Sequence, residues 1–226
     1  MRSPLLSKIP GIAHGFGGRR ANVPEPFDGP VWGPWEQTRR RATQVHGVAS
    51  AELKARGQTC DEADAFWTRT PEVPAGVMTA DCVPVLLAHE EGRAVAAVHA
   101  GWRGTRARIL EALWRELSAA LPPELARPEA WVAAIGPSIG PCCYQVSEEL
   151  ARDFVAEFPG SVPRERMLDL QAVNRSQLEG LGIRRVDVVA PCTRCCLEVD
   201  GGFAFHSYRR EGGGTRQWSA IGIRGR

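Results

Sequence analysis

Three short segments of this chain, far apart in the sequence, each carry one side chain that can bind a metal ion. The three side chains are His46, Cys82 and His99, which are separated by 36 and 17 residues. No single helix or zinc finger places ligands at these separations, so only a folded domain can bring them together. Two imidazoles and one thiolate suit zinc, and three protein ligands leave a coordination position open for water or substrate. The pattern indicates a catalytic metal site.

The residues between Cys82 and His99 predict a pair of buried strands. Residues 83–88 form a nearly continuous apolar run, residues 89–92 interrupt it with charged residues and a glycine, and residues 94–98 resume it. Such runs separated by a turn are typical of two strands of a hairpin. Cys82 would enter the first strand and His99 would leave the second, so a hairpin would place both ligands at the same end.

The rest of the chain alternates between predicted helices and strands, which indicates a mixed α/β class. Thr105 is expected to cap a helix that carries apolar residues from Ile109 to Leu117 and ends before Pro122. The N-terminus of that helix would lie beside His99 and could hold phosphate or carboxylate. The other expected elements are helices over 147–158 and 169–181, strands over 131–135 and 186–190, and a loop or irregular strand pair over 20–36.

Composition limits the classes of function. The 226 residues are 43% hydrophobic and 24% charged, which suits one globular domain over 1–226. A net charge of +2 does not favour nucleic acid or an anionic membrane as partner, and the arginine run 39–41 is expected to be solvated. No apolar stretch approaches the roughly 20 residues that span a bilayer, and the N-terminal residues lack a secretory core. Seven cysteines, an odd number, fit a reducing cytoplasm, which is the expected location.

Short motifs occur along nearly the whole chain: Thr43–Gly47, Ala63–Ala65, Thr79–Cys82, His99–Gly104, Gly136-Pro137, Cys142–Tyr144, Ser207–Arg210 and Arg216-Gln217. In this order they resemble the YfiH/DUF152 family, whose members have been called multicopper polyphenol oxidases or laccase-domain proteins. The resemblance implies a single domain of mixed β-sheets packed face to face with helices outside, and zinc, or alternatively copper, bound by His46, Cys82 and His99. It also implies purine nucleoside phosphorylase activity on adenosine, inosine or S-methyl-5′-thioadenosine with phosphate, and adenosine deaminase activity.

Two carboxylates of these motifs are expected nearest the metal. Asp64 is expected to be a general base or to support a metal ligand, and Asp81 to orient His46 or His99. In an extended segment the Asp81 side chain would point away from that of Cys82. Turn capping is the alternative for both carboxylates.

Phosphorolysis also requires cations around the phosphate. Arg19 and Arg209 are the candidates because a guanidinium matches phosphate geometry, and Arg103 is a weaker third that could simply pack on Trp102. The chain departs from the resembled family after Arg19: it continues Arg20-Ala21-Asn22, whereas family members have a Gly-Gly pair. His14 and His206 are left open as site or structural residues, and His89, in the charged turn, is expected to be solvated.

Other functions remain open at this point. A peptidoglycan editing factor would use the same zinc site to remove a misplaced amino acid from UDP-MurNAc-amino acid. A copper polyphenol oxidase would need more than the five histidines present. A metal-free hydrolase would use Cys82 as nucleophile and His99 as base. A structural zinc site would need a fourth ligand such as Cys142 or Cys143.

The C-terminal part contains a CxxC motif, Cys192 to Cys195. A zinc ribbon needs a second ligand pair, and Cys142 and Cys143 are adjacent instead of separated by two residues. A thioredoxin-like motif would be expected close to a first strand-helix unit. The prediction for these cysteines is therefore unpaired thiols that line or support the site.

Overall fold

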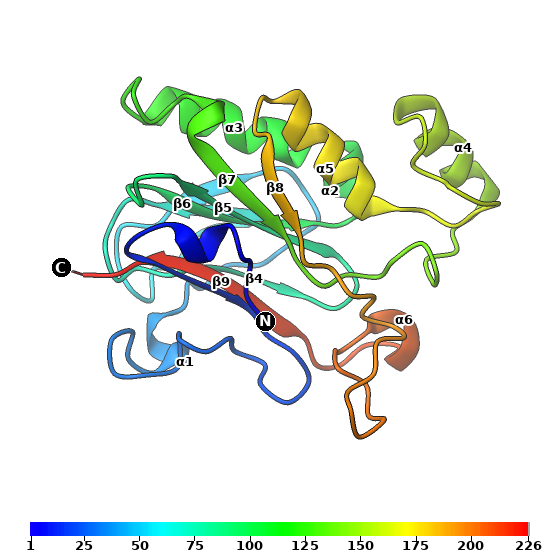
Figure 1. Ribbon diagram of the computed structural model, residues 1–226, viewed down its shortest axis with the longest axis horizontal. Coiled ribbons are helices and arrows are strands. Elements are labelled where there is room, and N and C mark those ends of the chain that lie inside the picture. Colours follow the sequence, from blue (N-terminus) through cyan, green and yellow to red (C-terminus); the bar gives the residue numbers. More distant parts are fainter. Residues whose placement is uncertain (226) are drawn as a thin grey trace.

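The computed structural model describes residues 1–225 and contains two β-sheets, one above the other in Figure 1. The larger sheet has the order β2-β3-β6-β5-β7-β8, and the smaller has the order β1-β9-β4. The strands of the larger sheet are β2 (Ser50–Glu52), β3 (Ala65–Thr68), β5 (Val83–His89), β6 (Val95–Ala100), β7 (Trp131–Ile135) and β8 (Arg185–Val188). Those of the smaller sheet are β1 (Ile12–Phe16), β4 (Ala75–Thr79) and β9 (Gln217–Ile223).

Six α-helices and two 3-10 turns complete the described chain, and the mixed α+β class is as predicted. α3 and α5 lie on the face of the larger sheet that is turned away from the smaller one (Figure 1). The helices are α1 (Trp35–Thr38), α2 (Trp102–Arg106), α3 (Ile109–Ala120), α4 (Glu148–Glu157), α5 (Leu170–Gly180) and α6 (Tyr208–Glu211), and the 3-10 turns are η1 (Leu6–Lys8) and η2 (Pro128–Ala130). None of the helices in this part of the chain is long and apolar enough to cross a membrane.

Alternating side chains of β5 are buried on both faces of the larger sheet. Val85 and Leu87 pack with the helices, whereas Leu86 and Ala88 pack with the smaller sheet. This double burial explains the nearly continuous apolar run that predicted the strand, since a strand covered on both faces has no polar side. A third cluster of aromatic residues covers the outer face of the smaller sheet and accounts for the tryptophan-rich segment 20–36.

The predicted hairpin is confirmed. β5 and β6 pair antiparallel, with Val83 opposite Ala100 and Pro84 opposite His99. The strand predicted over 131–135 is β7 with the same bounds, and the strand predicted over 186–190 is shifted slightly to β8. The register brings the start of β5 and the end of β6 to one edge, where Cys82 and His99 lie.

The predicted starts of two helices are confirmed by their caps. Ser147 accepts a hydrogen bond from Leu150 N at 3.2 Å ahead of α4, and Asp169 accepts one from Ala172 N at 3.0 Å ahead of α5. Each cap satisfies one N–H group that the first helical turn leaves without a backbone partner.

The local predictions for Thr105 and His89 are wrong. Thr105 does not cap a helix: it lies inside the short α2 and is buried, and its hydroxyl accepts a hydrogen bond from Asn174 Nδ2. The helix restarts after Arg108, which has a left-handed backbone with φ 60°. His89 is 3% exposed and not solvated, because it is the last residue of β5 and its ring lies edge-on to Trp131, 6.0 Å between centroids.

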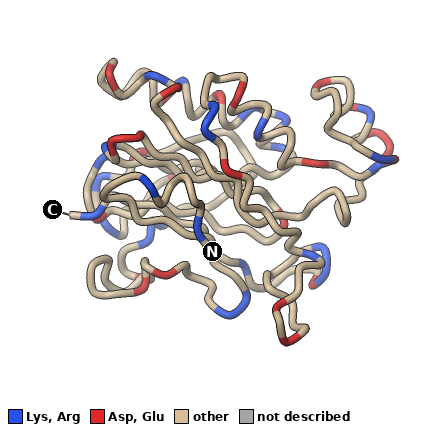
Figure 2. Tube along the Cα trace, viewed as in Figure 1, with Lys and Arg blue, Asp and Glu red and all other residues tan. Residues whose placement is uncertain are grey.

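The arginine run 39–41 is not uniformly solvated, because Arg40 is 2% exposed. Its guanidinium lies 3.9 Å from the ring centroid of Phe66 and donates hydrogen bonds to Gly76 O at 3.0 Å and Ala42 O at 2.8 Å. Burial lowers the pKa of Arg40 to about 10, so the group stays charged at neutral pH. Charged residues of both signs are otherwise interspersed along the trace (Figure 2).

We expect Arg40→Ala to lower the free energy of unfolding by about 3 kcal/mol, because it leaves buried carbonyl groups without donors and a cavity beside Phe66. Arg41→Ala is the matched control, since Arg41 is exposed, and its effect should stay within about 0.5 kcal/mol. Urea denaturation of both variants measures the difference. Equal stabilities for the two variants would contradict this account of Arg40.

Candidate metal centre

The fold brings His46, Cys82 and His99 together, and we call them the triad. One ligand atom from each lies within 4.8 Å of the others. The rings of His46 and His99 are 4.8 Å apart between centroids at an interplanar angle of 71°. His99 is buried, Cys82 is half-buried and His46 is exposed, so the group opens to the surface on the His46 side. The described part of the chain thus brings the three predicted candidate ligands together.

A close approach of the chain at Gly101 leaves room for the triad. A Cβ atom at Gly101 would lie 2.9 Å from Cδ2 of His46 and 3.1 Å from Sγ of Cys82. Gly101 directly follows β6, next to the pairing of Ala100 with Val83. Only a residue without a side chain lets the end of the hairpin pass this close to both ligands.

The buried carboxylate of Asp64 fixes two of the ligands. Its oxygens accept hydrogen bonds from the backbone N–H groups of Val45 at 3.1 Å, His46 at 3.0 Å and Gly47 at 2.8 Å. Oδ1 also lies 2.7 Å from Nδ1 of His99. Three successive amides can converge on one carboxylate because His46 has φ 63°, a left-handed conformation that curves the backbone around an anion.

These contacts shift the pKa values of Asp64, His99 and Cys82. Burial alone would raise the pKa of Asp64, but the hydrogen bonds from His99 and from the Gly47 and His46 amides outweigh it, so the pKa is lowered. Burial would lower the pKa of His99, but Asp64 and Cys82 raise it to about 9. Burial opposes ionisation of Cys82, yet hydrogen bonds with both imidazoles lower its pKa to about 6. The site therefore favours a thiolate, the form of cysteine that binds metal.

Asp81 is placed differently from the prediction. Its φ of 88° shows that the segment is not extended, so the argument from strand alternation fails there. The carboxylate accepts hydrogen bonds from Thr193 Oγ1 at 2.6 Å, Ser207 Oγ at 3.1 Å and Arg209 N at 2.7 Å. Within the described part of the chain no hydrogen bond links it to His46 or His99. Asp81, the residue before Cys82, instead binds two C-terminal segments, one with Thr193 and one with Ser207 and Arg209.

Arg209 lies close to the triad through Tyr144, a residue that the sequence did not single out for a role. The Arg209 guanidinium is 5.3 Å from the Tyr144 ring centroid and donates to Gln145 O at 2.9 Å. Burial, followed by the negative charge of Cys82, raises the pKa of Tyr144 to about 12. The only signal in the sequence was the position of this tyrosine directly after a cysteine pair.

The other candidates have partners outside the triad. Arg19 forms an ion pair with Glu211 at the end of α6. Arg103 packs over the Trp102 ring at 5.1 Å, the alternative considered for it. His14 is buried and accepts a hydrogen bond from Ser3 N at 2.9 Å, and His206 contacts Asn22 and Thr215. Neither belongs to the triad.

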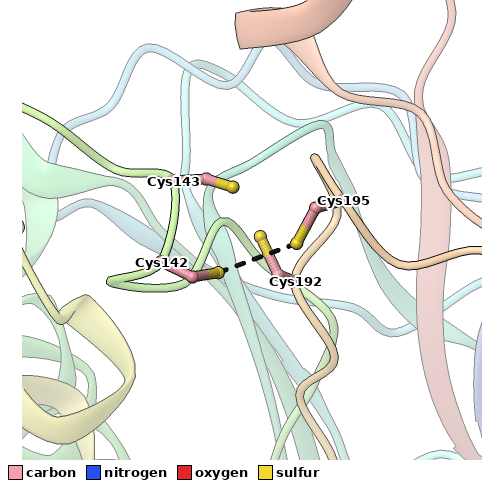
Figure 3. Close-up of side chains that lie close together, drawn as sticks. All are labelled: Cys142, Cys143, Cys192 and Cys195. Atoms are coloured by element: carbon pink, nitrogen blue, oxygen red, sulfur yellow. Dashed lines mark hydrogen bonds between the residues drawn. The ribbon is translucent and has the colours of Figure 1, made fainter.

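Four cysteines form a second group that does not include the triad (Figure 3). None of the four belongs to the group of His46, Cys82 and His99, so the alternative of a structural zinc site with Cys142 or Cys143 as fourth ligand is not supported. No disulfide joins them, so they are free as predicted. The four are Cys142, Cys143, Cys192 and Cys195, and we call them the thiol cluster.

Comparison with known proteins finds a matching family model, similar sequences and similar folds. The family model described as multi-copper polyphenol oxidoreductase laccase matches residues 34–224. A protein named purine nucleoside phosphorylase from Deinococcus radiodurans is 40% identical over 188 residues, covering 81% of this chain and 69% of that protein. A protein named adenosine deaminase RL5, from an unknown prokaryotic organism, is 35% identical over 174 residues, covering 69% of this chain and 64% of that protein. YlmD from Geobacillus stearothermophilus, a crystal structure, matches with TM-score 0.76 and 26% identity over 99% of this chain and 94% of that one.

We expect Asp64→Asn to weaken zinc binding by about 10- to 100-fold, because the amide loses the charge and turns an NH2 group toward at least one backbone or imidazole donor. Asp61→Asn is the matched control, since Asp61 is exposed three residues earlier. Competition with a chromophoric chelator measures both affinities. An unchanged affinity in Asp64→Asn would show that the carboxylate does not organise the triad.

We expect Gly101→Ala to weaken zinc binding as well, because its methyl group would displace His46 or Cys82. Gly180→Ala is the control, since a Cβ atom at Gly180 meets no heavy atom within 4 Å. Isothermal titration with zinc should show a loss in the first variant and wild-type affinity in the second. Wild-type affinity in both variants would mean that the backbone relaxes around the added methyl group.

Proposed function

This chain belongs to the family described as multi-copper polyphenol oxidoreductase laccase, and we propose that it is a zinc-dependent enzyme that phosphorolyses purine nucleosides and deaminates adenosine. The observation that carries the proposal is the triad, in which two imidazoles and a thiolate converge beside a surface opening. The names of relatives at 40% and 35% identity support the choice of substrate.

The residues present fit a zinc ion. His46, Cys82 and His99 are the nitrogen and sulfur donors that zinc prefers, and a set of three is typical of catalytic zinc. His99 directs Nδ1 to Asp64, which leaves Nε2 as the ligand atom, and a carboxylate behind a metal-binding imidazole is the usual arrangement. Zinc held there would supply Lewis-acid chemistry, polarising a substrate oxygen or lowering the pKa of water.

Asp64 acts in this proposal as a positioning residue. A carboxylate has about four acceptor sites, and here three amides and one imidazole already occupy them. It has no remaining site from which to take a substrate proton, so the alternative of a general base is not favoured. Its role is to hold His46 and His99 in their ligand geometry.

Arg209 and Tyr144 are proposed to bind substrate beside the triad. Tyr144 stays protonated at neutral pH, because its pKa is raised to about 12 by burial and by Cys82, and so it can donate a hydrogen bond. Arg209 brings a guanidinium to the same place, and a guanidinium fits phosphate with two parallel hydrogen bonds. Arg19 pairs with Glu211 of α6 and is proposed to contribute to the field around phosphate.

The two reactions make and break different bonds. In phosphorolysis a phosphate oxygen bonds to ribose C1′ while the C1′–N9 bond breaks, and the purine leaves with that electron pair and gains a proton. In deamination a water oxygen bonds to C6 of adenosine and ammonia leaves. Only the first reaction needs a cation at the phosphate, so Arg209 should matter more for phosphorolysis than for deamination.

The histidines do not favour copper oxidation by several ions in one chain. All five histidines are described, and only His46 and His99 share a site. His14, His89 and His206 are buried elsewhere. Two imidazoles and a thiolate also suit a single copper ion, which the metal content of the purified protein distinguishes from zinc.

The test is incubation of zinc-loaded protein with adenosine, with and without phosphate, followed by chromatography of the products. We expect adenine only when phosphate is present and inosine in both conditions. His46→Ala should lose both products, and a chelator should remove them until zinc is restored. Arg41→Ala, a change at an exposed residue outside the triad, is the control that should keep both.

Absence of both products from zinc-loaded protein would overturn the nucleoside proposal. The muramoyl amide of a nucleotide-linked cell-wall precursor is then the next substrate, because a zinc centre can also hydrolyse an amide. Activity that survives complete removal of metal would instead favour the Cys82-His99 pair as nucleophile and base, in which the lowered pKa of Cys82 supports a thiolate nucleophile.

A further inference from the structure

The thiol cluster is built by two loops that leave neighbouring strands. Cys142 and Cys143 lie in the turn after β7, and Cys192 and Cys195 lie in the turn after β8. β7 and β8 are parallel neighbours, so the loops that follow them leave the same edge of the sheet. The pairing continues past the strands through a bridge between Ser138 and Cys192. Sheet topology therefore brings together cysteines about 50 residues apart.

The spacing of the sulfur atoms fits one metal ion. All four Sγ atoms lie within 4.8 Å of one another, and those of Cys142 and Cys195 are 3.7 Å apart. Zinc–sulfur bonds of about 2.3 Å in a tetrahedron place the sulfurs about 3.8 Å apart. A disulfide requires about 2.05 Å, so this pair is at the spacing of shared metal ligands and not of a covalent bond. In Figure 3 the four thiols point toward a common centre.

The surroundings of the cluster suit a negatively charged metal-thiolate group. The backbone N–H of Gly140 donates to Sγ of Cys192 at 3.3 Å, the kind of contact that stabilises a thiolate ligand. Four thiolates around one divalent cation carry a net negative charge. Arg210 brings a guanidinium to the same turn, where it donates to Thr193 O at 3.0 Å and Arg194 O at 2.8 Å.

We propose that the thiol cluster is a second metal site, which binds zinc through four thiolates and is separate from the triad. Four protein ligands leave no position for water or substrate, so this site is structural. The segment 194–203 contains no buried side chain, so hydrophobic packing contributes little to its order. A zinc ion would fix this segment to the loop after β7, and its binding would contribute folding free energy.

The proposed structural zinc site is connected to the triad through Asp81. Thr193, between the two cysteines of the CxxC turn, donates to the Asp81 carboxylate, and Ile139 N donates to Asp81 O at 2.9 Å. Both loops that build the thiol cluster therefore bind the residue that precedes Cys82. The proposal does not depend on the reaction at the triad, because its test reads metal binding alone.

The deciding experiment uses the full chain with the triad disabled and the thiol cluster intact. His46→Ala combined with Cys82→Ser is purified under reducing conditions without chelator, and its zinc is measured by mass spectrometry and X-ray absorption. We expect about one zinc ion per chain with only sulfur ligands near 2.3 Å, against about two per chain in the wild type. Absence of zinc, or nitrogen or oxygen ligands around it, would overturn the proposal.

Cysteine substitutions in the same background assign the ligands. Cys192→Ser with Cys195→Ser should remove the remaining zinc, whereas Cys196→Ser, the matched control one residue further along, should retain it. Retention of zinc in the first variant would refute the assignment.

Mass spectrometry of unreduced protein gives an independent check. A mass lower by two hydrogens, located at Cys142 and Cys195, together with the absence of zinc, would identify a disulfide instead. If a cysteine variant fails to fold, the first experiment still decides the question, because its variant leaves all four cysteines of the thiol cluster unchanged.

Discussion

The buried Asp64 carboxylate is the contact on which the candidate metal centre depends. It lies directly before β3 and is held by its own backbone as well as its side chain: Asp64 N donates to Ala49 O at 3.0 Å, and Asp64 O accepts from His99 N at 2.7 Å. Burial of a charged carboxylate costs free energy unless donors surround it, and here three amides and an imidazole supply them. The same four donors fix the loop that carries His46 and the orientation of His99, so stability and ligand geometry come from one interaction.

The sheet contributes the second constraint. β5 and β6 are covered on both faces, so their register is set by packing on two sides, and a slip of one residue would exchange the buried faces. That register places Cys82 and His99 at one edge, and Gly101 lets the chain pass beside them. The strand pair thus positions two ligands, while the third, His46, comes from a loop that hydrogen bonds to Asp64 hold in place.

The sequence predicted the parts of this arrangement that depend on local pattern. The hairpin, two capped helices, the strand over 131–135 and the three residues of the triad followed from apolar runs, cap residues and motifs. It did not predict features that depend on tertiary contacts. Arg40 is buried because its guanidinium packs on the ring of Phe66 and donates hydrogen bonds to the carbonyl groups of Gly76 and Ala42. Phe66 and Gly76 are distant from Arg40 in the sequence. Asp81 turned out to have a left-handed backbone, which no strand pattern reveals.

The cysteines show why the remaining part could not be predicted. Spacing along the chain argued against a metal site, because Cys142 and Cys143 are adjacent and the CxxC turn has no partner pair nearby in sequence. Parallel pairing of β7 with β8 removes that objection, since it places the two loops at one edge whatever their separation along the chain. Asp81 then receives hydrogen bonds from both loops and directly precedes Cys82. The thiol cluster and the triad are therefore connected through Asp81, which binds both cysteine-bearing loops and is covalently linked to Cys82.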